Sequence, residues 1–543
     1  MQTDTPQAAQ KQVELHGKNI IGGALSADGD SSFRALDPAT ATELCPSFTQ
    51  ATADEIAAAV TAAEGAAREY AQCGPERRAS FLRRIGDEIV ALGDALVGRC
   101  SAETGLPAAR IISERGRTVA QLAMFAELIE QGWWLEARID TARPERRPQP
   151  RPDLRRMLQP LGPVAVFGAS NFPLAFSVAG GDTASALAAG NPVVVKAHPC
   201  HPGTSELVGE AIRRAAAELS MPAGVFSLLH GQSHATGQTL VQQDPLRAVG
   251  FTGSAAAGRA LMGIAAARRQ PIPVFAEMGS ANPVFLLPGA LAERGDAIAQ
   301  GLAASATLGV GQFCTKPGLV FGVRSPQFSA LMEAAASKLA DLPESPMLSA
   351  AICKRYRDGV QCLAAMPALS VVAGGSDAAR NTEAVLGRAS AFVTSAAAVL
   401  ADPALQQELF GPVTIFVQAG SAAEMLQAAA ALEGQLTATI HATEADLQQN
   451  SELLALLEQK AGRVICNGFP TGVEVCHAMH HGGPYPATTD ARFTSVGSAA
   501  IARFARPVCY QDLPDAALAP ELQRANPRGI LRLVDGAYTR DPA

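Results

Sequence analysis

The chain has 543 residues, of which 48% are hydrophobic and 17% charged, so it can bury a large interior and is not an intrinsically disordered protein. Its length exceeds that of one ordinary domain and predicts two or three. The net charge of -7 offers no basic footprint for nucleic acid, so we expect no nucleic-acid partner.

Ten cysteines are scattered along the chain, and no two of them form a Cys-x-x-Cys pair. This spacing predicts neither a zinc framework nor a redox pair, so we expect free thiols and no bound metal. The N-terminal segment is polar and lacks the apolar core of a signal peptide, and no apolar run reaches the roughly 18 residues of a membrane span. We therefore expect a protein of the reducing cytoplasm that does not bind a membrane.

Helices are predicted from Asp54 onward, after a short tail and a small β region within residues 1–50. Thr52 suits the N-cap of the first helix, and the carboxylates of Asp54 and Glu55 suit its positive end. The first ten residues of the later stretch 143–156 are rich in arginine and proline, which excludes a helix interior or a central strand there. It predicts an extended connector, or an edge ribbon paired with another subunit, in preference to a phosphate-binding arm.

From residue 162 onward, apolar strand-like runs alternate with alanine-rich helical segments. This alternation is typical of βαβ units and predicts a parallel sheet with helices on both faces. Strands are expected at residues 164–167, 193–196, 225–229, 248–251 and 273–276. A second α/β domain is expected to contain strands at residues 284–287, 318–323, 391–393, 413–417, 437–440 and 463–467.

Polar residues follow three of the first five strands, at the edge where parallel α/β sheets bind ligands. Asn171 lies in FGASNFP, Lys196 in VVVKAHP, and Thr252, Gly253 and Ser254 in FTGSAAAG. The last motif is equally well explained as an ordinary N-cap and as a cradle for a pyrophosphate. Lys196 is either a lysine that extends to solvent or a donor to ribose and phosphate, and Asn171 is either a turn residue or part of a site.

The stretch 271–321 delivers a carboxylate and a thiol to expected sheet edges. Glu277 ends an apolar run in AEMGS, and a glycine-rich turn presents Cys314 in GQFC. A thiol that attacks and a carboxylate that activates water suit a covalent mechanism. Alone, Cys314 could be a small buried side chain and Glu277 a cap or an ion-pair partner. Their combination with Asn171 favours chemistry.

A second group of potential metal ligands consists of Cys476, His477, His480 and His481. Its spacing matches no established zinc pattern, and a glycine–proline turn follows it. We therefore expect a loop without a metal at this place.

The motifs FGASNFP, VVVKAHP, FTGS, AEMGS, GQFC and ELFGPV, in this order and at these spacings, resemble the aldehyde dehydrogenase superfamily. The wider context, including PVFAEMGSANPVFLLPGAL and PTGVEVCHAMHHGGPYPATTD, is similar to its α-ketoglutaric semialdehyde (2,5-dioxopentanoate) dehydrogenases. The resemblance covers nearly the whole chain. It implies an α/β fold with a Rossmann-like cofactor domain, an α/β catalytic domain and an oligomerisation arm.

The resemblance implies that Cys314 is the nucleophile, Glu277 the general base and Asn171 a donor to the oxyanion. An aldehyde would be oxidised to a carboxylate through a thiohemiacetal and a thioester on Cys314. The most similar group implies α-ketoglutaric semialdehyde as the substrate and 2-oxoglutarate as the product. A fatty or other medium-chain aldehyde is the alternative, because Ala123 stands where related dioxopentanoate enzymes tend to have arginine.

The resemblance also implies that the cofactor is NADP or NAD and identifies residues that would bind it. Lys196 matches the ribose-binding lysine, and Ser254 in FTGS matches the pyrophosphate contact. Glu408 in ELFGPV matches the carboxylate that holds the nicotinamide ribose, with Phe410 beside the ring. Pro199 stands where NAD-preferring relatives often have a glutamate, so a 2′-phosphate meets no repulsion and NADP should be accepted.

The resemblance also implies how the chain is divided. Residues 1–142 and 162–276 would form the cofactor domain, 277–482 the catalytic domain, and 143–161 with 483–543 the arm and tail. Because an arm of this kind joins subunits, a homodimer or homotetramer is expected.

The residues alone leave two other functions open. A cysteine hydrolase that pairs the thiol with a histidine would not need NAD(P), and a binding protein on a retired dehydrogenase scaffold would usually lack one of the catalytic residues.

Overall fold

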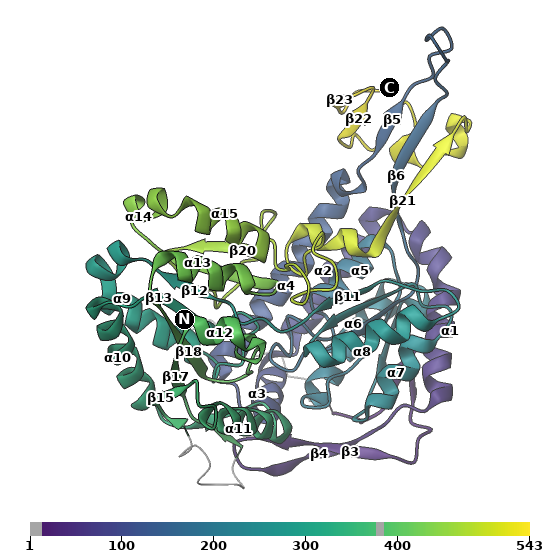
Figure 1. Cartoon of the computed structure of the whole chain (residues 1–543). Helices are drawn as coiled ribbons and strands as arrows, with labels where there is room; N and C mark the ends of the chain where they lie inside the picture. Colours follow the sequence, from purple (N-terminus) through teal and green to yellow (C-terminus); the bar gives the residue numbers. More distant parts are fainter. Residues whose placement is uncertain (1–13, 376–384) are drawn as a thin grey trace, which may run out of the picture.

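Two seven-stranded sheets and a five-stranded sheet organise the computed structural model of the chain, which describes residues 14–375 and 385–543 (Figure 1). The predicted α/β class is confirmed. The first residues of the polar N-terminal segment lie outside the described part. Two small antiparallel sheets of two strands each complete the described strands: β3 (Ser32–Asp37) with β4 (Thr42–Thr49), and β14 (Ser345–Pro346) with β16 (Leu386–Gly387).

The first large sheet has the strand order β11-β10-β7-β8-β9-β1-β2. Its five parallel strands lie where the sequence predicted them: β7 (Val164–Phe167), β8 (Val193–Lys196), β9 (Phe226–Leu229), β10 (Ala248–Thr252) and β11 (Val274–Glu277). Two short antiparallel strands, β1 (Asn19–Ile21) and β2 (Ala24–Ser26), extend one edge. The chain runs outward from β7 through β8 and β9 and then crosses to β10 and β11, so the strand order reverses beside β7, the position where doubly wound sheets bind ligands.

Both faces of this sheet are buried, because successive side chains of a strand point to opposite faces. Val164 and Val166 belong to one apolar cluster, while Ala165 and Phe167 belong to another. Helices α1 (Ala53–Gln72), α7 (His234–Gln242) and α8 (Ala255–Ala267) cover the second face. The other face carries α2 (Pro75–Ala91), α3 (Gly93–Thr104), α4 (Ala108–Gln131), α5 (Gly181–Ala189) and α6 (Pro202–Glu218).

The first helix begins where the sequence predicted. Thr52 Oγ1 accepts a hydrogen bond of 3.1 Å from the Glu55 N–H, and Glu55 Oε2 accepts one of 2.9 Å from the Thr52 N–H. This reciprocal capping box satisfies two of the free amides at the helix start.

The second large sheet has the order β15-β17-β18-β13-β12-β19-β20 and is parallel except for β15. Its strands are β12 (Val284–Leu286), β13 (Leu319–Val323), β15 (Ser370–Ala373), β17 (Ser390–Ser395), β18 (Val413–Ala419), β19 (Gln435–His441) and β20 (Ala461–Cys466). Six of these confirm the predictions. The edge strand β15 was missed, because its half-exposed SVVA run has too little apolar alternation to be distinguished from a loop.

Helices pack on both faces of this second sheet as well. They are α9 (Pro288–Thr307), α10 (Pro326–Ala340), α11 (Ala350–Ala364), α12 (Ala396–Ala401), α13 (Ala422–Ala431), α14 (Glu444–Gln449) and α15 (Ser451–Lys460). Short 3-10 turns lie at η1 (Trp133–Leu135), η2 (Ala223–Val225), η4 (Pro403–Gln406), η5 (Ser498–Phe504), η6 (Asp515–Ala517) and η7 (Pro520–Leu522). No helix in the described part of the chain is long and apolar enough to cross a membrane.

The five-stranded sheet forms an arm that projects from the body of the molecule (Figure 1). Its order is β21 (Ala505–Gln511), β6 (Leu154–Pro160), β5 (Arg138–Asp140), β22 (Arg532–Val534) and β23 (Ala537–Thr539). Residues 143–151 of the arginine- and proline-rich stretch form the exposed tip between β5 and β6, closed by a bridge between Arg143 and Arg151, and the end of the stretch belongs to β6. The proposed domain boundaries stay a prediction.

Candidate active site

Cys314 is presented by a tight turn that follows α9. Gly309, Val310 and Gly311 all have positive φ, at 57°, 58° and 63°. A Cβ on Gly311 would lie 2.4 Å from the carbonyl carbon of Gly411, so only glycine fits this close approach of two backbones. On the other side, the Asn282 amide donates to the carbonyl oxygens of Cys314 at 2.8 Å and Lys316 at 3.0 Å. These contacts fix the loop that carries the thiol.

Glu277 ends β11 and is buried, with 4% of its surface exposed. Its Oε1 lies 2.9 Å from Nε2 of His481, and its Oε2 accepts a short hydrogen bond from the Ser495 hydroxyl. The same Nε2 lies 3.5 Å from Sγ of Cys314. Thiol, imidazole and carboxylate therefore meet at one point, although they come from three separate parts of the chain.

The pKa values of Cys314 and Glu277 are shifted in opposite directions. Burial raises the pKa of Cys314 well above its ordinary value, and the negative charges of Glu277 and Glu408 raise it further against the opposing effect of Arg117. Burial would also raise the pKa of Glu277, but His481, Ser495 and the thiol outweigh it, so that this pKa is lowered. The thiol is thus protonated and the carboxylate charged. A neighbouring base must remove the thiol proton before the sulfur can attack.

Asn171 lies in the loop after β7 and faces the thiol loop. Its Nδ2 donates to the carbonyl oxygen of Gln312 at 3.0 Å. The chain just beyond it is anchored by the buried Glu114 of α4, whose Oε1 accepts the N–H groups of Leu174 and Ala175, each at 2.9 Å. A side-chain amide held beside a nucleophile in this way can donate to a developing oxyanion.

His481 is the residue that the sequence analysis did not assign to this site. It was grouped with its neighbours as a potential metal cluster, but His477 turns its Nδ1 to the Ser498 hydroxyl at 3.0 Å, and only His481 faces Cys314 and Glu277. No local spacing could have revealed this. The pairing depends on a bridge between Glu277 and Thr488, which are far apart in sequence.

Comparisons with known proteins agree with this chemistry. Residues 25–492 match the model of the aldehyde dehydrogenase family. The chain belongs to that family. The chain is also 52% identical over 525 residues to α-ketoglutaric semialdehyde dehydrogenase 2 of Azospirillum brasilense, covering 96% of this chain and 99% of that protein. It is 45% identical over 532 residues to the α-ketoglutaric semialdehyde dehydrogenase of Acinetobacter baylyi, covering 97% and 100%.

Solved structures share the fold at low sequence identity. Lactaldehyde dehydrogenase of Escherichia coli superposes with a TM-score of 0.78 at 21% identity, covering 91% of this chain and 98% of that one. Betaine aldehyde dehydrogenase of Staphylococcus aureus, solved with NAD⁺, gives 0.78 at 19%, covering 93% and 99%. The protein is therefore an aldehyde dehydrogenase with the fold of that family, an oxidoreductase that uses NAD or NADP.

The residues predicted to hold this cofactor fit it. Lys196 ends β8, and among the described residues its ammonium group has no hydrogen-bond partner, while burial lowers its pKa to about 8. Ser254 caps α8, its Oγ accepting the Ala257 N–H at 3.3 Å, so the exposed start of this helix follows β10 directly. Thr252 is the last residue of β10, and Gly253 connects it to Ser254. A half-buried cation at the end of β8, without a hydrogen-bond partner among the described residues, and the exposed helix start after β10 suit a ribose and a pyrophosphate.

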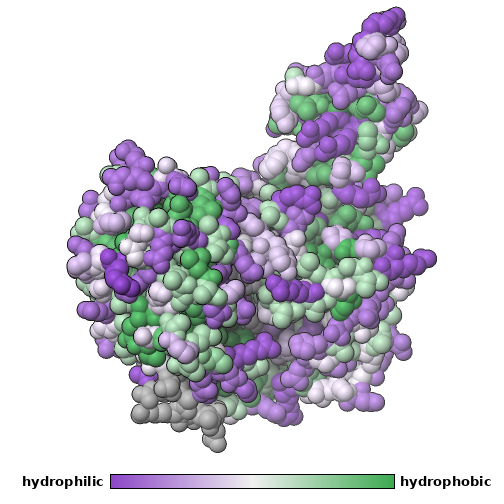
Figure 2. All heavy atoms as spheres, viewed as in Figure 1, coloured by the Kyte–Doolittle hydropathy of each residue, from purple (hydrophilic) through white to green (hydrophobic). Residues whose placement is uncertain are grey.

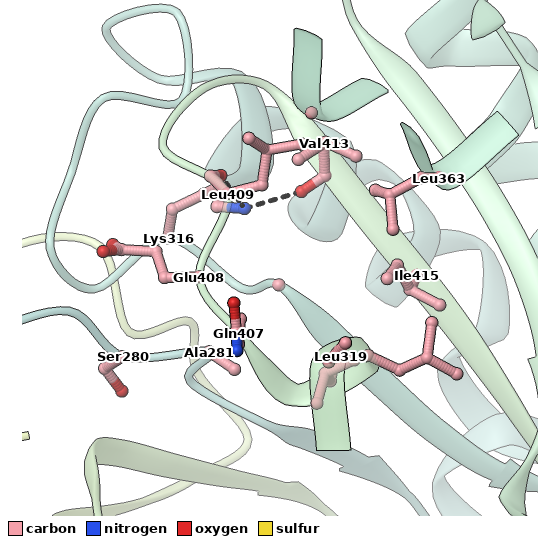
Figure 3. Close-up of a pocket in the computed structure, with 14 residues that line it drawn as sticks. Ser280, Ala281, Lys316, Leu319, Leu363, Gln407, Glu408, Leu409, Val413 and Ile415 are labelled. Carbon is pink, nitrogen blue, oxygen red and sulfur yellow. Dashed lines mark hydrogen bonds between the residues drawn. The ribbon is translucent and has the colours of Figure 1, made fainter. Parts of the chain in front are cut away.

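Glu408 and Phe410 lie in the loop before β18, and Phe410 packs half-buried against the large apolar cluster. Glu408 lines a cavity of about 160 Å³ and lies so close to Gly279 that a Cβ there would come within 2.3 Å of its Oε2 (Figure 3). Burial raises the pKa of Glu408 to about 7, and Lys316 opposes this rise.

Lys316 is a further site residue that the sequence analysis missed. It is buried two residues after the thiol, and its Nζ donates to the carbonyl oxygens of Val413 at 2.7 Å and Leu409 at 3.2 Å (Figure 3). Burial lowers its pKa to about 8, although Glu408 favours the charged form. This ammonium group therefore ties the loop that carries Glu408 to the loop that carries Cys314.

We predict that Lys316→Met weakens cofactor binding and shifts its pH dependence. Because Lys316 lowers the pKa of Glu408, removing the ammonium group should raise that pKa above about 7. The ionised carboxylate would then form only at higher pH, and the midpoint of cofactor affinity should move to more alkaline pH. Calorimetric titration with NAD and NADP between pH 6 and pH 9 (roughly one to two units either side of the pKa) measures this shift.

Lys354→Met is the matched control, because Lys354 is exposed and pairs with Asp358 at 2.6 Å, on the surface of α11. It should leave the profile unchanged. An unchanged midpoint in Lys316→Met would contradict the coupling between Lys316 and Glu408.

Proposed function

We propose that this enzyme oxidises α-ketoglutaric semialdehyde to 2-oxoglutarate, with Cys314 as the nucleophile. The observation that carries the choice of substrate is the high identity, over nearly the full chain, to two relatives that bear this name. The convergence of Cys314, His481 and Glu277 supports the covalent route.

In the first step, His481 Nε2 takes the thiol proton while the sulfur bonds to the aldehyde carbon. Glu277 stabilises the resulting imidazolium because it lies 2.9 Å away. The aldehyde oxygen becomes an oxyanion that accepts hydrogen bonds from the Asn171 amide and the Cys314 N–H. Such donors typically contribute about 3 kcal/mol each in the transition state.

Lys196, Ser254 and Glu408 would hold NAD or NADP, which would supply the acceptor for the hydride that leaves the thiohemiacetal carbon. The carbon then forms a thioester with Cys314. Glu277 takes a proton from a water molecule that attacks this thioester, the carbon–sulfur bond breaks, and the sulfur recovers its proton from His481. The lowered pKa of Glu277 keeps its carboxylate ready for this second step.

We expect Glu277→Gln to separate the two steps. Without a base for the water, the thioester should persist, so one equivalent of reduced cofactor should form rapidly and turnover should then fall by about 10²–10⁴-fold. Stopped-flow absorbance of the reduced cofactor measures both phases. Cys314→Ala, as the control, should give neither a burst nor turnover. Loss of the burst in Glu277→Gln, with slow turnover retained, would contradict this prediction, because it would show that the pairing of Glu277 with His481 limits thioester formation more than the activation of water limits its hydrolysis.

Arg117 on α4 supports a substrate with a remote carboxylate. Its guanidinium lies over the rings of Phe172 at 5.6 Å and Phe176 at 5.4 Å. It is mostly buried and is close enough to Cys314 to oppose the rise of the thiol pKa. Its Nε and Nη2 have no hydrogen-bond partner among the described residues. A buried cation with unused donors in a bidentate fork suits a carboxylate.

Arg117→Met should raise KM for α-ketoglutaric semialdehyde by about 10–100-fold, because a hydrogen bond between charged groups contributes about 1.5–3 kcal/mol. The KM for pentanal, an uncharged aldehyde of the same length, should change little. Steady-state assays with both aldehydes measure the difference. Arg115→Met is the matched control, since Arg115 lies on the same helix but donates to the Gly93 carbonyl at 3.1 Å.

Equal increases in KM for the two aldehydes would contradict this prediction and give Arg117 a structural role.

A wild-type preference for pentanal would favour the alternative function, oxidation of medium-chain aldehydes. Each assay with NAD and with NADP also tests the cofactor. We infer that NADP is accepted, because the loop after Lys196 offers Pro199 instead of a carboxylate that would repel a 2′-phosphate.

We further propose a cytoplasmic homo-oligomer, a dimer or a tetramer. All ten cysteines are free, which suits a reducing compartment. The arm projects far from the body, and its surface carries apolar as well as polar side chains (Figure 2). Among the apolar ones, Tyr538 is 72% and Leu513 39% exposed. Its outer strand β21 and the outer strand β20 of the catalytic sheet both have a free edge that a second copy can pair with.

Multi-angle light scattering should therefore give a mass that is an even multiple of 56.1 kDa at micromolar concentration. Burial of the exposed apolar side chains of the arm is the physical reason, because their removal from water is favourable. A monomeric mass would contradict the proposal, and dilution series would show whether the assembly dissociates.

A further inference from the structure

We propose that Cys314, His481 and Glu277 together form a binding site for Zn²⁺, and that bound Zn²⁺ inhibits the enzyme reversibly. The inhibition rests on the proposed catalytic roles of these residues. The binding of the metal does not, because it depends only on the three donor atoms and their geometry.

The three side chains offer one thiol sulfur, one imidazole nitrogen and one carboxylate oxygen within 4.8 Å of one another. In a tetrahedral zinc site with bonds of about 2.3 Å to sulfur and 2.0–2.1 Å to nitrogen, these two donors lie about 3.6 Å apart. Cys314 Sγ and His481 Nε2 lie 3.5 Å apart, which already matches this separation. Glu277 Oε1 lies 2.9 Å from Nε2 and must move outward by about 0.4 Å to reach a tetrahedral position.

A second observation points to a ligand between these groups. Glu277 Oε1 is buried and receives no hydrogen bond of acceptable geometry from the described residues, although Nε2 of His481 lies 2.9 Å away. The imidazole and the carboxylate are therefore close without being well aligned with each other. A buried oxygen that has a charged neighbour but no well-aligned hydrogen bond can accept a further ligand. A metal ion placed between the thiol, the imidazole and the carboxylate would satisfy it.

The charge around the thiol favours a cation. The carboxylate of Glu277, which has 4% of its surface exposed, lies within 4.8 Å of the Cys314 sulfur, so water screens its negative charge poorly. A divalent ion that displaces the thiol proton to solvent compensates this negative field and stabilises the thiolate. One proton is released for each ion bound, and no electron is transferred.

The donor set selects the class of metal. Thiolate and imidazole with one carboxylate suit Zn²⁺, which takes three protein ligands and leaves a fourth position for water. Mg²⁺ and Ca²⁺ prefer oxygen ligands only and should not bind here. Within residues 14–375 and 385–543, no second group of three such donors comes together. In particular, Cys476 and His480 stay outside the group although they neighbour His481 in sequence.

Bound zinc would block both catalytic steps. A sulfur that is bonded to the metal cannot attack the aldehyde, and Nε2 of His481 cannot accept a proton while its lone pair is coordinated. Removal of the ion by a chelator restores all three groups, so the inhibition is reversible and leaves the covalent structure unchanged.

The test uses the purified full-length enzyme, reduced and stripped of metal. Equilibrium dialysis against buffered free Zn²⁺, followed by metal analysis, measures binding, and Co²⁺ in place of Zn²⁺ reports a thiolate ligand through its charge-transfer absorption. We expect one ion per chain in the wild type. Cys314→Ser and His481→Gln should each weaken binding by at least about 10-fold, the lower bound for losing even an indirect partner of a metal.

The double variant Cys476→Ser/His480→Gln is the control, since it removes the neighbouring donors outside the site. It should bind Zn²⁺ as the wild type does. Circular dichroism melting verifies that each variant folds, and the conservative Glu277→Gln provides a third ligand change if one variant does not. Wild-type binding in Cys314→Ser and His481→Gln, or loss of binding only in the double variant, would overturn the proposal.

Aldehyde oxidation is assayed separately with and without Zn²⁺ and a chelator. Inhibition that the chelator reverses supports the proposal. Zinc binding that depends on the three residues in an enzyme that oxidises no aldehyde would retain the metal site and refute the proposed function. Full activity at a zinc concentration that saturates the wild-type site would refute the inhibition.

Discussion

The buried carboxylate of Glu277 is the group on which the geometry of the site depends. Residues 276–278 pair with a remote segment: the Met278 N–H donates to the Ala487 carbonyl at 2.7 Å, and the Thr489 N–H donates to the Ala276 carbonyl at 3.1 Å. That segment also brings the Ser495 hydroxyl to the carboxylate. An unpaired charge in this position would cost several kcal/mol, so the end of β11 and the remote segment hold each other in place. His481 lies on the same segment and is thereby fixed between carboxylate and thiol.

Each of the two large sheets contributes a different set of residues to the site. The first sheet contributes Glu277, Asn171, Lys196 and the start of α8, all from the carboxyl ends of its parallel strands. The second sheet contributes the thiol loop before β13 and the Glu408 loop before β18, which Lys316 joins through two backbone carbonyls. A site built between two parallel sheets can therefore place a cofactor on one side of the sulfur and a substrate on the other, because each sheet fixes its own set of loops.

The electrostatics of the site explain why a histidine is needed. Burial raises the pKa of the Cys314 thiol, and the charges of Glu277 and Glu408 raise it further, so the sulfur is a poor nucleophile until a base acts on it. His481 is the base within reach, and Glu277 is the anion that stabilises its charged form. The same concentration of negative charge and soft donors also makes the site receptive to a thiophilic cation. Reactivity toward aldehydes and affinity for zinc thus arise from one arrangement.

The sequence by itself determined the parallel strands, because buried apolar runs between alanine-rich helices have no other stable arrangement, and eleven predicted strands lie in the two large sheets. It also identified Cys314, Glu277 and Asn171 as candidates, because their motifs follow strands or glycine turns, and family resemblance supplied their roles. Only the tertiary structure decided that His481 faces the thiol, that Lys316 supports Glu408 and that Arg117 has unused donors. Those three depend on contacts between distant segments, and a local pattern carries no information about which distant partner a polar side chain meets once the chain has packed.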